Sequence, residues 1–524
     1  MMKTKYIFRG LITLLLLAIS VSGCESYNEE LLDGIGNTRE FSPIGLTSKI
    51  RNSTTVELNW NVKTDENVDH YVVEFSPDDP EFKTIFKSLN VSPDQLPIQV
   101  ALEGETTYSI RVKAVSAAGL EDSKWSVTTA TTLSEQIFFP IKAEEIQGES
   151  VTVRWTPNSN VTQILVQPGN ITHTITAEEK TAGVAIVTGL TPETDYTATL
   201  KNGTKTRGIL TFTSGVDLKN GIIVNPGDDL NAKIAQASAG SRLLLMPGIY
   251  QTTGEVILNK TLIIRGVRPE NKPKLNVKFT VNAGLVNLSL VDLELHGTAL
   301  TNAAVVTISG ASNYGDILIS KCNVHDYTRA LMAASVSNSK LNSFTVDNSI
   351  VKSVNTNAGA DFIDFRNTYV ASILLKNSTF DSCSTGRDFV RVDAVLPANG
   401  GFSGTGLKTT TSIQSCTLYN VSSTAAPKRI LYVRFLDNSS TVMNTLIVST
   451  TAIYTNQAAT ETPTFSKNYY YAAPSFMDAS IALNKVDASG VTANPQFVDP
   501  ATGNFKVQNQ TLIDNNIGDP RWLK

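Results

Sequence analysis

A repeat in the C-terminal half of the chain constrains its fold most strongly. Segments of alternating apolar residues begin at 317, 344, 373, 411 and 440. One position of this pattern recurs at 266, 293, 322, 349, 378, 416 and 445, at intervals of 27, 29, 27, 29, 38 and 29 residues. Such a period is typical of a solenoid, whose turns bury their apolar sides against neighbouring turns. We therefore predict stacked turns over this part of the chain.

The long interval and the polar positions refine this prediction. A loop is expected between Val392 and Thr411, where Gly400, Gly401, Gly404 and Gly406 cluster. The sequence does not fit the two other common repeat folds: leucine-rich repeats need a denser leucine pattern, and propeller blades need four strands in about forty residues. Asn348, Asn377 and Asn444 share one repeat position. We expect their side chains to form a ladder in a tight turn that satisfies backbone groups turn after turn.

The start of the repeat region carries a second signal. A short helix is predicted over 228–239, followed by a Pro-Gly-Ile-Tyr sequence at 247–250 and an apolar strand at 261–266. This run resembles the opening of pectin-lyase-like β-helices. The resemblance implies a right-handed parallel β-helix over 216–465 with a short N-terminal capping helix.

Two modules of alternating short strands precede the repeats, at 41–133 and 135–213. Each has a Trp on an early strand, Trp60 or Trp155, and the second has a Leu-Thr-Pro-Glu-Thr-Asp-Tyr sequence at 190–196. This pattern resembles the fibronectin type III domain. The predicted fold class is therefore all-β: two fibronectin type III-like sandwiches that act as spacers, followed by the β-helix.

The N-terminus has the pattern of an export signal. Lys3, Lys5 and Arg9 precede an apolar run at 11–21 that is too short to span a bilayer as a mature helix. It ends at Ser22-Gly23-Cys24, which resembles the recognition site of lipoprotein signal peptidase. The resemblance implies a signal peptide at 1–23 and lipidation of Cys24. Glu25, Glu29 and Glu30 follow in an acidic tether at 24–40. This acidic stretch is similar to the surface-export signal of Gram-negative glycan-utilisation lipoproteins, which implies a lipid-anchored protein on the outer membrane at the cell surface.

Charge is unevenly distributed along the chain. Residues 25–215 carry 15 basic and 26 acidic side chains, a net charge of −11, whereas residues 216–524 carry 26 and 22, a net charge of +4. A basic C-terminal part suits an anionic ligand such as a uronate polymer. The alternative is that surface charge varies between modules without functional meaning. We expect no nucleic-acid partner.

The three cysteines after Cys24 are predicted to be buried and unpaired. Cys322 and Cys416 share a repeat position three turns apart. At about 4.8 Å per turn they would be roughly 14 Å apart, too far for a disulfide bond. We interpret Cys322, Cys383 and Cys416 as small apolar core residues.

Charged side chains recur on one strand of three successive turns, at 361–366, 388–393 and 429–434. Stacked in parallel register, these strands predict two ladders on the outer face of the coil while the alternate apolar residues point inward. The ladders consist of Asp364, Arg391 and Tyr432, and of Arg366, Asp393 and Arg434.

Three interpretations of the ladders remain open. In the first, the ladders are exposed ion pairs that fix the register. In the second, they are a binding surface in which the arginines pair with sugar carboxylates and Tyr432 stacks on a sugar ring. In the third, the protein is a polysaccharide lyase in which Asp364 and Asp393 hold Ca²⁺ and Arg391 accepts a proton. That last role is demanding because arginine is effectively always protonated.

Complete catalytic motifs of β-helix enzymes are not found. The segment 361–365 resembles one string of pectin methylesterases, but the other strings of that family are missing, as are the Arg-rich strings of pectate lyases. Leu295-His296-Gly297 is a lone fragment of the polygalacturonase pattern. His296 and His325 occupy near-equivalent positions on consecutive turns. They are interpreted either as a metal-binding pair, for which no third ligand is found, or as surface residues.

The C-terminal segment contains the sequences Asn-Pro-Gln-Phe-Val-Asp-Pro at 494–500 and Ile-Gly-Asp-Pro-Arg-Trp at 517–522. These sequences resemble the tail of β-helix lipoproteins of unknown function that are encoded beside outer-membrane glycan importers. We expect a cap over 466–524, in which Phe497 and Trp522 plug the open end of the coil. The sequence therefore predicts a surface lipoprotein that binds an acidic, pectin-like polysaccharide, and the resemblance implies such an importer as its partner. A Ca²⁺-dependent lyase and an adhesin or structural protein are the alternatives.

Overall fold

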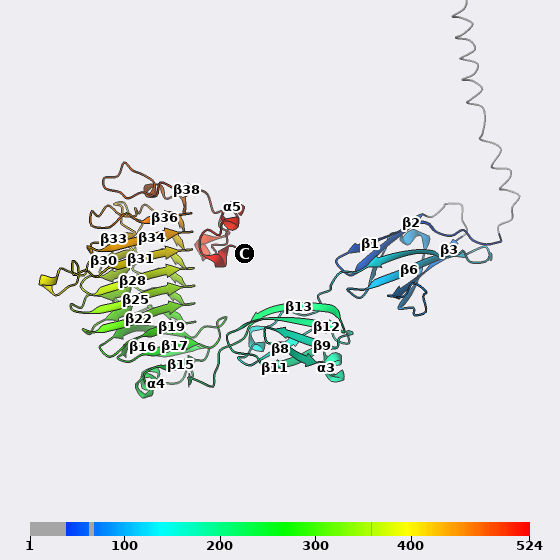
Figure 1. The fold of residues 1–524 in the computed structure, drawn as a ribbon, viewed down its shortest axis with the longest axis horizontal. Helices are drawn as coiled ribbons and strands as arrows, with labels where there is room; N and C mark the ends of the chain where they lie inside the picture. The colour runs from blue at the N-terminus through cyan, green and yellow to red at the C-terminus, as the bar shows by residue number, and fades with distance from the viewer. Residues whose placement is uncertain (1–37, 62–67, 358) are drawn as a thin grey trace, which may run out of the picture. The chain divides into compact units, whose positions relative to one another are not determined.

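A computed structural model describes residues 38–61, 68–357 and 359–524, with the side chains of 251–253 left aside (Figure 1). The chain divides into two compact units, which we describe separately. One comprises the residues up to Glu145 together with Ser150–Gly189 and Asp195–Thr213; the other comprises Ile146–Glu149, Leu190–Thr194 and Ser214–Lys524. The predicted signal peptide and Cys24 lie outside the described residues. No helix among the described residues is long and apolar enough to cross a bilayer.

The first unit contains two antiparallel β-sandwiches. In the first sandwich, Trp60 and Tyr71 pack edge to face with ring centroids 5.1 Å apart, and both are buried. Its sheets have the orders β1-β2-β5 and β4-β3-β6-β7. The strands are β1 (Ile44–Arg51), β2 (Thr55–Asn61), β3 (Val68–Pro77), β4 (Lys87–Val91), β5 (Ile98–Ala101), β6 (Thr107–Ser116) and β7 (Ser126–Thr131).

The second sandwich buries Trp155 and Tyr196. Its sheets have the orders β11-β8 and β10-β9-β12-β13. The elements are β8 (Ser150–Arg154), β9 (Gln163–Gln167), β10 (Ile171–Thr174), α3 (Ala177–Ala182), β11 (Val184–Thr188), β12 (Asp195–Asn202) and β13 (Lys205–Thr213). The predicted fibronectin type III-like sandwiches are confirmed.

The second unit is a parallel β-helix whose turns contribute up to three strands each. The first strands of the turns form a ten-stranded parallel sheet, β14-β15-β17-β19-β22-β25-β28-β31-β34-β36. These strands are β14 (Ile222–Val224), β15 (Ser241–Leu245), β17 (Leu262–Gly266), β19 (Leu288–Val291), β22 (Asn313–Ser320), β25 (Lys340–Asp347), β28 (Tyr369–Lys376), β31 (Thr409–Gln414), β34 (Asn438–Met443) and β36 (Thr464–Ser466).

The second and third strands of the turns belong to one sheet, because β18 (Lys274–Val281) pairs with strands of both sets. The second strands are β20 (Glu294–His296), β23 (Asn323–His325), β26 (Ile350–Lys352), β29 (Thr379–Asp381), β32 (Thr417–Tyr419), β35 (Leu446–Val448) and β37 (Tyr469–Tyr471). The third strands are β21 (Ala304–Ile308), β24 (Ala330–Ala334), β27 (Ile363–Phe365), β30 (Val390–Val392) and β33 (Leu431–Val433). Two further strands, β16 (Ile249–Leu258) and β38 (Val491–Thr492), lie at the two ends of the coil.

The register agrees with the sequence repeat. Ile317 pairs with Phe344, Phe344 with Ile373 and Ile373 with Thr411. A continuous apolar core runs through the turns, and the helix α4 (Leu230–Gln236) adds Leu230 and Ile234 to it. The predicted parallel β-helix and its short capping helix are therefore confirmed.

The tight turn of each repeat is built differently from the expected asparagine ladder. Asn348, Asn377 and Asn444 have φ values of 49°, 50° and 49°, a left-handed conformation that asparagine tolerates better than most residues. The side chain of Asn377 donates to the carboxylate of Asp347, and that of Asn348 accepts from Arg521. These bonds join side chains, so the ladder to the backbone was predicted at the wrong position.

The buried ladder lies one residue later in each turn. The hydroxyl of Ser349 accepts from the N–H of Cys322 at 3.1 Å, and the hydroxyl of Ser378 accepts from the N–H of Ser349 at 3.0 Å. Asn468 accepts from the N–H of Thr445 in the same way. These side chains point into the coil, where an unsatisfied backbone group would be costly.

The cysteines Cys322, Cys383 and Cys416 are free and buried. Burial raises the pKa of each thiol to about 12. The prediction that they serve as unpaired core residues is confirmed.

The C-terminal segment does not plug the coil. The last turns are filled by Tyr454, Tyr470 and Phe476. Residues 494–524, which contain α5 (Gln510–Asp514), lie beside the coil instead (Figure 1). The indole N–H of Trp522 donates to Thr379 of β29 at 2.7 Å. The prediction for Phe497 and Trp522 is therefore wrong: they join an apolar cluster on the flank of the coil, which contains Leu446 and Val448.

Candidate functional site

The long interval in the repeat forms a loop at 394–408, between β30 and β31, which we call the insertion loop. It contains a short 3₁₀ turn at Pro397–Asn399 and projects from the coil (Figure 1). Gly400 has a φ of 79°, and a side chain on Gly401 would collide with the carbonyl oxygen of Val395. Glycine at these two positions lets the loop fold back toward β30.

The charged residues on β27, β30 and β33 stack as predicted. Asp364 pairs with Arg391, and Arg391 pairs with Tyr432. The second ladder continues the register just past the strands, because Asp393 N–H donates to Phe365 O and Arg434 N–H donates to Val392 O, both at 2.8 Å. The structure therefore brings all six predicted residues together on three successive turns.

The carboxylates differ from the prediction in their exposure. Asp364 is 4% and Asp393 is 8% exposed, whereas the side chains of Arg366 and Arg434 are 37% and 46% exposed. Both ladders were expected to be exposed throughout, and this expectation is wrong for the aspartates. The arginines cover the carboxylates because burial of an ionised carboxylate requires a close cationic partner.

Asp393 joins two turns of the coil. Its Oδ1 lies 2.6 Å from Nε of Arg434, and its Oδ2 lies 2.5 Å from Nη2 of Arg391. Burial opposes ionisation of Asp393, but the hydrogen bonds from Arg434 and Arg391 outweigh it and hold the pKa of the carboxyl below its usual value. Asp393 is therefore an ionised anchor for two guanidinium groups.

Asp364 anchors the arginine at the other end of the cluster. Nε of Arg366 lies 2.9 Å from both oxygens of Asp364. This hydrogen bonding raises the pKa of Arg366. The N–H of Asp361 also donates to Asp364, at 3.1 Å.

Four further residues belong to the cluster and were not singled out from the sequence. Nη2 and Nε of Arg429 each lie 2.9 Å from the carboxylate of Asp388. Asp361 accepts from Nη1 of Arg391 at 3.2 Å and pairs with Arg387. Asp361, Asp388 and Arg429 lie three residues before Asp364, Arg391 and Tyr432. The same repeat register could therefore have revealed them as a third ladder.

The ring of Tyr432 is in contact with three guanidinium groups. Its ring centroid lies 4.3 Å from the guanidinium carbon of Arg429, 5.2 Å from that of Arg434 and 5.3 Å from that of Arg391. Cation–π contacts of this kind orient the guanidinium groups. The ring therefore supports the arginines, which leaves less of it for stacking on a sugar.

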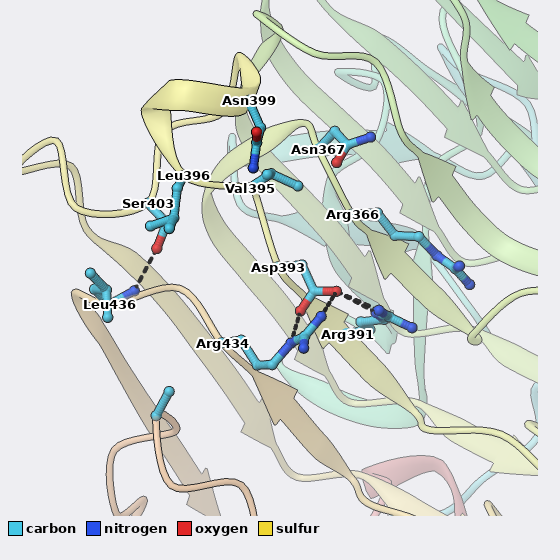
Figure 2. A pocket seen from close by; sticks show the side chains of 11 residues that line it. Arg366, Asn367, Arg391, Asp393, Val395, Leu396, Asn399, Ser403, Arg434 and Leu436 are labelled. Carbon is cyan, nitrogen blue, oxygen red and sulfur yellow. Dashed lines mark hydrogen bonds and ion pairs between the residues drawn. The ribbon is translucent and has the colours of Figure 1, made fainter.

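Two hollows open on this face of the coil. The loop hollow, of about 590 Å³, lies between the insertion loop and the arginines (Figure 2). Its lining includes Arg366, Arg391, Asp393, Arg434, Val395, Leu396, Leu436 and Ala459. The polar hollow, of about 140 Å³, lies at the start of the same strands and is lined by Asp361, Arg387, Asp388, Arg391, Lys428, Arg429 and Tyr432. Arg391 contributes to both.

The two aspartates considered as Ca²⁺ ligands are engaged by arginine. A cation at Asp364 or Asp393 would have to displace Arg366, or Arg391 and Arg434, from short ion pairs. Ca²⁺ takes six to eight oxygen ligands, and no group of three or more His, Cys, Asp or Glu suited to a metal occurs among the described residues. The donor set therefore does not fit a calcium site.

The histidine pair lies away from the ladders, on the second strands of its turns. His296 and His325 stack with ring centroids 5.7 Å apart. Burial, and then the neighbouring His325, lower the pKa of His296. Nε2 of His325 lies 3.6 Å from a carboxylate oxygen of Glu294, and its Nδ1 lies 2.7 Å from Asp326.

These features define an all-β protein that combines a fibronectin type III region with a β-helix, an architecture that fits a surface carbohydrate-binding or structural protein. The fibronectin type III domain model matches residues 41–131. Two domains of unknown function, DUF4957 and DUF5123, match residues 248–383 and 411–522. The candidate cluster begins within the first of these matches and ends within the second.

Two of the similar solved structures are arrays of fibronectin type III domains. A two-domain fibronectin type III segment of chicken tenascin is 19% identical, with 33% of this chain and 97% of that chain covered and a TM-score of 0.23. The central fibronectin III array of a RIM-binding protein is 16% identical, with 34% and 63% covered and a TM-score of 0.15. No curated protein matches the chain.

Proposed function

We propose that this protein is a surface lipoprotein that binds an acidic polysaccharide through the arginine cluster of its β-helix. The observation that carries the proposal is the layered arrangement of charge. Four aspartates are buried beneath five arginines, so positive groups face the solvent while their counter-charges lie below. The residues are Asp361, Asp364, Asp388 and Asp393 beneath Arg366, Arg387, Arg391, Arg429 and Arg434.

Arg366 and Arg434 are the ligand-contacting residues in this proposal. In each, Nε and Nη2 hold the buried aspartate, which fixes the guanidinium plane while the side chain stays about a third to a half exposed. A guanidinium that is already oriented loses little conformational entropy on binding. It can then donate from its outer side to a sugar carboxylate in a charge-assisted hydrogen bond.

Arg391 has a positioning role. Its three guanidinium nitrogens all bind carboxylates, Nε and Nη2 to Asp393 and Nη1 to Asp361. Burial opposes its charge, but the bonds to Asp393 and Asp361 raise its pKa. A group that holds its proton this strongly is a poor proton acceptor. Together with the engaged aspartates, this favours binding over the lyase alternative.

The cellular setting follows from the sequence and completes the proposal. Lipidation of Cys24 would anchor the chain in the outer membrane, and the sandwiches would hold the β-helix away from the lipid. A bound polysaccharide would then serve glycan utilisation, with an outer-membrane importer as partner. The resemblance of the C-terminal segment to lipoproteins encoded beside such importers supports this setting.

Affinity gel electrophoresis of residues 25–524 with polygalacturonate tests the proposal. We expect retardation without Ca²⁺, and its loss at high salt because exposed charges are screened. Arg366→Gln combined with Arg434→Gln should weaken binding about tenfold to a hundredfold, the size expected for charge-assisted hydrogen bonds. Lys321→Gln combined with Lys506→Gln removes two exposed charges elsewhere and should change little.

Two outcomes separate the alternatives. An unsaturated product that absorbs in the ultraviolet, formed with Ca²⁺ and lost with chelator, would support the lyase. An absence of both retardation and product would reject the binding proposal in favour of an adhesin or structural protein. Arg434→Lys keeps the charge but loses the bidentate geometry of the guanidinium group. Reduced binding by this variant would show that this geometry matters as well as the charge.

A further inference from the structure

The loop hollow has two chemically different sides. Leu396 of the insertion loop and Leu436, which follows β33, are 53% and 56% exposed. Both line the hollow together with Val395 and Ala459. In Figure 2, Leu396 and Leu436 lie on the opposite side of the view from Arg366 and Arg391, with Asp393 and Arg434 between them. An exposed pair of leucines beside a cationic cluster marks a site that accepts apolar groups.

The position of Leu436 is fixed by the insertion loop. Its backbone N–H donates to the hydroxyl of Ser403 at 3.0 Å, and Ser403 N–H in turn donates to the carbonyl of Ala394 at 3.0 Å. The loop therefore builds the apolar side and joins it to the segment after β30 that carries Asp393. The polar hollow, by contrast, is lined by charged residues and Tyr432 alone.

We propose that the apolar side of the loop hollow is a subsite for an aliphatic substituent next to the ligand's carboxylate. This inference rests on the proposed function and names the class of glycan. The ligand is an acidic polysaccharide in which a sugar beside the uronate carries a methyl group, either the C-methyl of a 6-deoxy sugar or the methyl of an O-acetyl ester. The carboxylate lies on Arg434 and the methyl group lies between Leu396 and Leu436.

Isothermal titration of residues 25–524 with three polymers tests the inference. Polygalacturonate carries no such methyl group, its O-acetylated form carries the ester, and alkali-treated rhamnogalacturonan carries only the deoxy sugar. Burial of one methyl group should strengthen binding about threefold to fivefold over polygalacturonate. The polymer that binds more tightly than polygalacturonate shows which source of the methyl group is recognised.

The variant Leu396→Asn combined with Leu436→Asn should remove this gain, so that its affinity for the methyl-bearing polymer falls to its affinity for polygalacturonate. Both leucines are exposed, so the fold should tolerate the change. Leu483→Asn, at another exposed leucine of the β-helix, is the matched control. Equal affinity for all three polymers, with no effect of the leucine variant, would overturn the inference alone. Failure of all three to bind would overturn the proposed function and the inference with it.

Discussion

Arg434 and Asp393 form a bidentate ion pair between adjacent turns of the coil, with Nε 2.6 Å from Oδ1 and Nη2 2.8 Å from Oδ2. Arg391, on the same turn as Asp393, binds the same carboxylate. One buried acid thus fixes two guanidinium groups at the edge of the loop hollow. Removal of that acid should affect both the stability of the coil and its binding surface.

The variant Asp393→Asn should lower the free energy of unfolding of the β-helix by about 1–3 kcal/mol. It removes the negative partner of two arginines and leaves Arg391 with Asp361 only. Urea denaturation followed by circular dichroism measures the change. Asp437→Asn, at an exposed aspartate nearby, should stay within about 0.5 kcal/mol of the wild type. Equal stability of the two variants would contradict this role for Asp393.

The contribution of Asp393 should depend on pH in one direction. Its pKa lies below the ordinary value because the arginines favour the ionised form against the effect of burial. The stability it adds is therefore fully present above the ordinary carboxyl pKa and lost as the pH falls through the lower, folded value. The difference in the free energy of unfolding between wild type and Asp393→Asn should stay constant from neutral pH down to about 5 and decrease progressively as the pH falls below about 4. A difference that closes near neutral pH would contradict this assignment.

The sequence predicted the register of these residues but not their burial. The repeat positions of Asp364, Arg391 and Tyr432 follow from counting residues, and the strands pair as counted. Exposure cannot be counted in this way, because it depends on which long side chains fold over which short ones. Arg366 and Arg434 cover Asp364 and Asp393 across and within turns, a contact that strand alternation does not contain.

Two other differences have similar causes. The asparagines mark the left-handed turn, but the inward side chain belongs to the next residue, so the buried ladder is formed by Ser349 and Ser378. The C-terminal aromatic residues were assigned to the open end because that end needs a cover. Tyr454 and Tyr470 fill it from within the last turns, and a hydrogen bond to Thr379 holds Trp522 on the flank.

The C-terminal segment should detach when Trp522 is removed. Trp522→Ala loses the hydrogen bond to Thr379 and the apolar contacts of the flank cluster. Limited trypsin digestion should then cleave after Lys506 about tenfold faster, corresponding to about 1.4 kcal/mol of lost docking free energy. Leu483→Ala, at an exposed residue outside this cluster, should leave the cleavage rate unchanged. An unchanged rate for Trp522→Ala would show that the indole does not hold the segment.

The cysteines should react only after unfolding. Cys322, Cys383 and Cys416 are buried, and burial raises the pKa of each thiol to about 12. A thiol of this kind is both inaccessible and protonated at pH 8. A colorimetric thiol reagent should therefore label none of them in residues 25–524 under native conditions and all three in urea. Rapid labelling of the native protein would contradict the buried core that the coil provides.

The most direct test of the binding surface is a crystal structure of residues 25–524 with a uronate oligosaccharide. The account predicts that sugar carboxylates lie within hydrogen-bonding distance, about 3 Å, of Arg434 or Arg366, with Asp393 and Asp364 still paired beneath them. An oligosaccharide bound only elsewhere on the protein, or none bound at concentrations that saturate binding in solution, would contradict it.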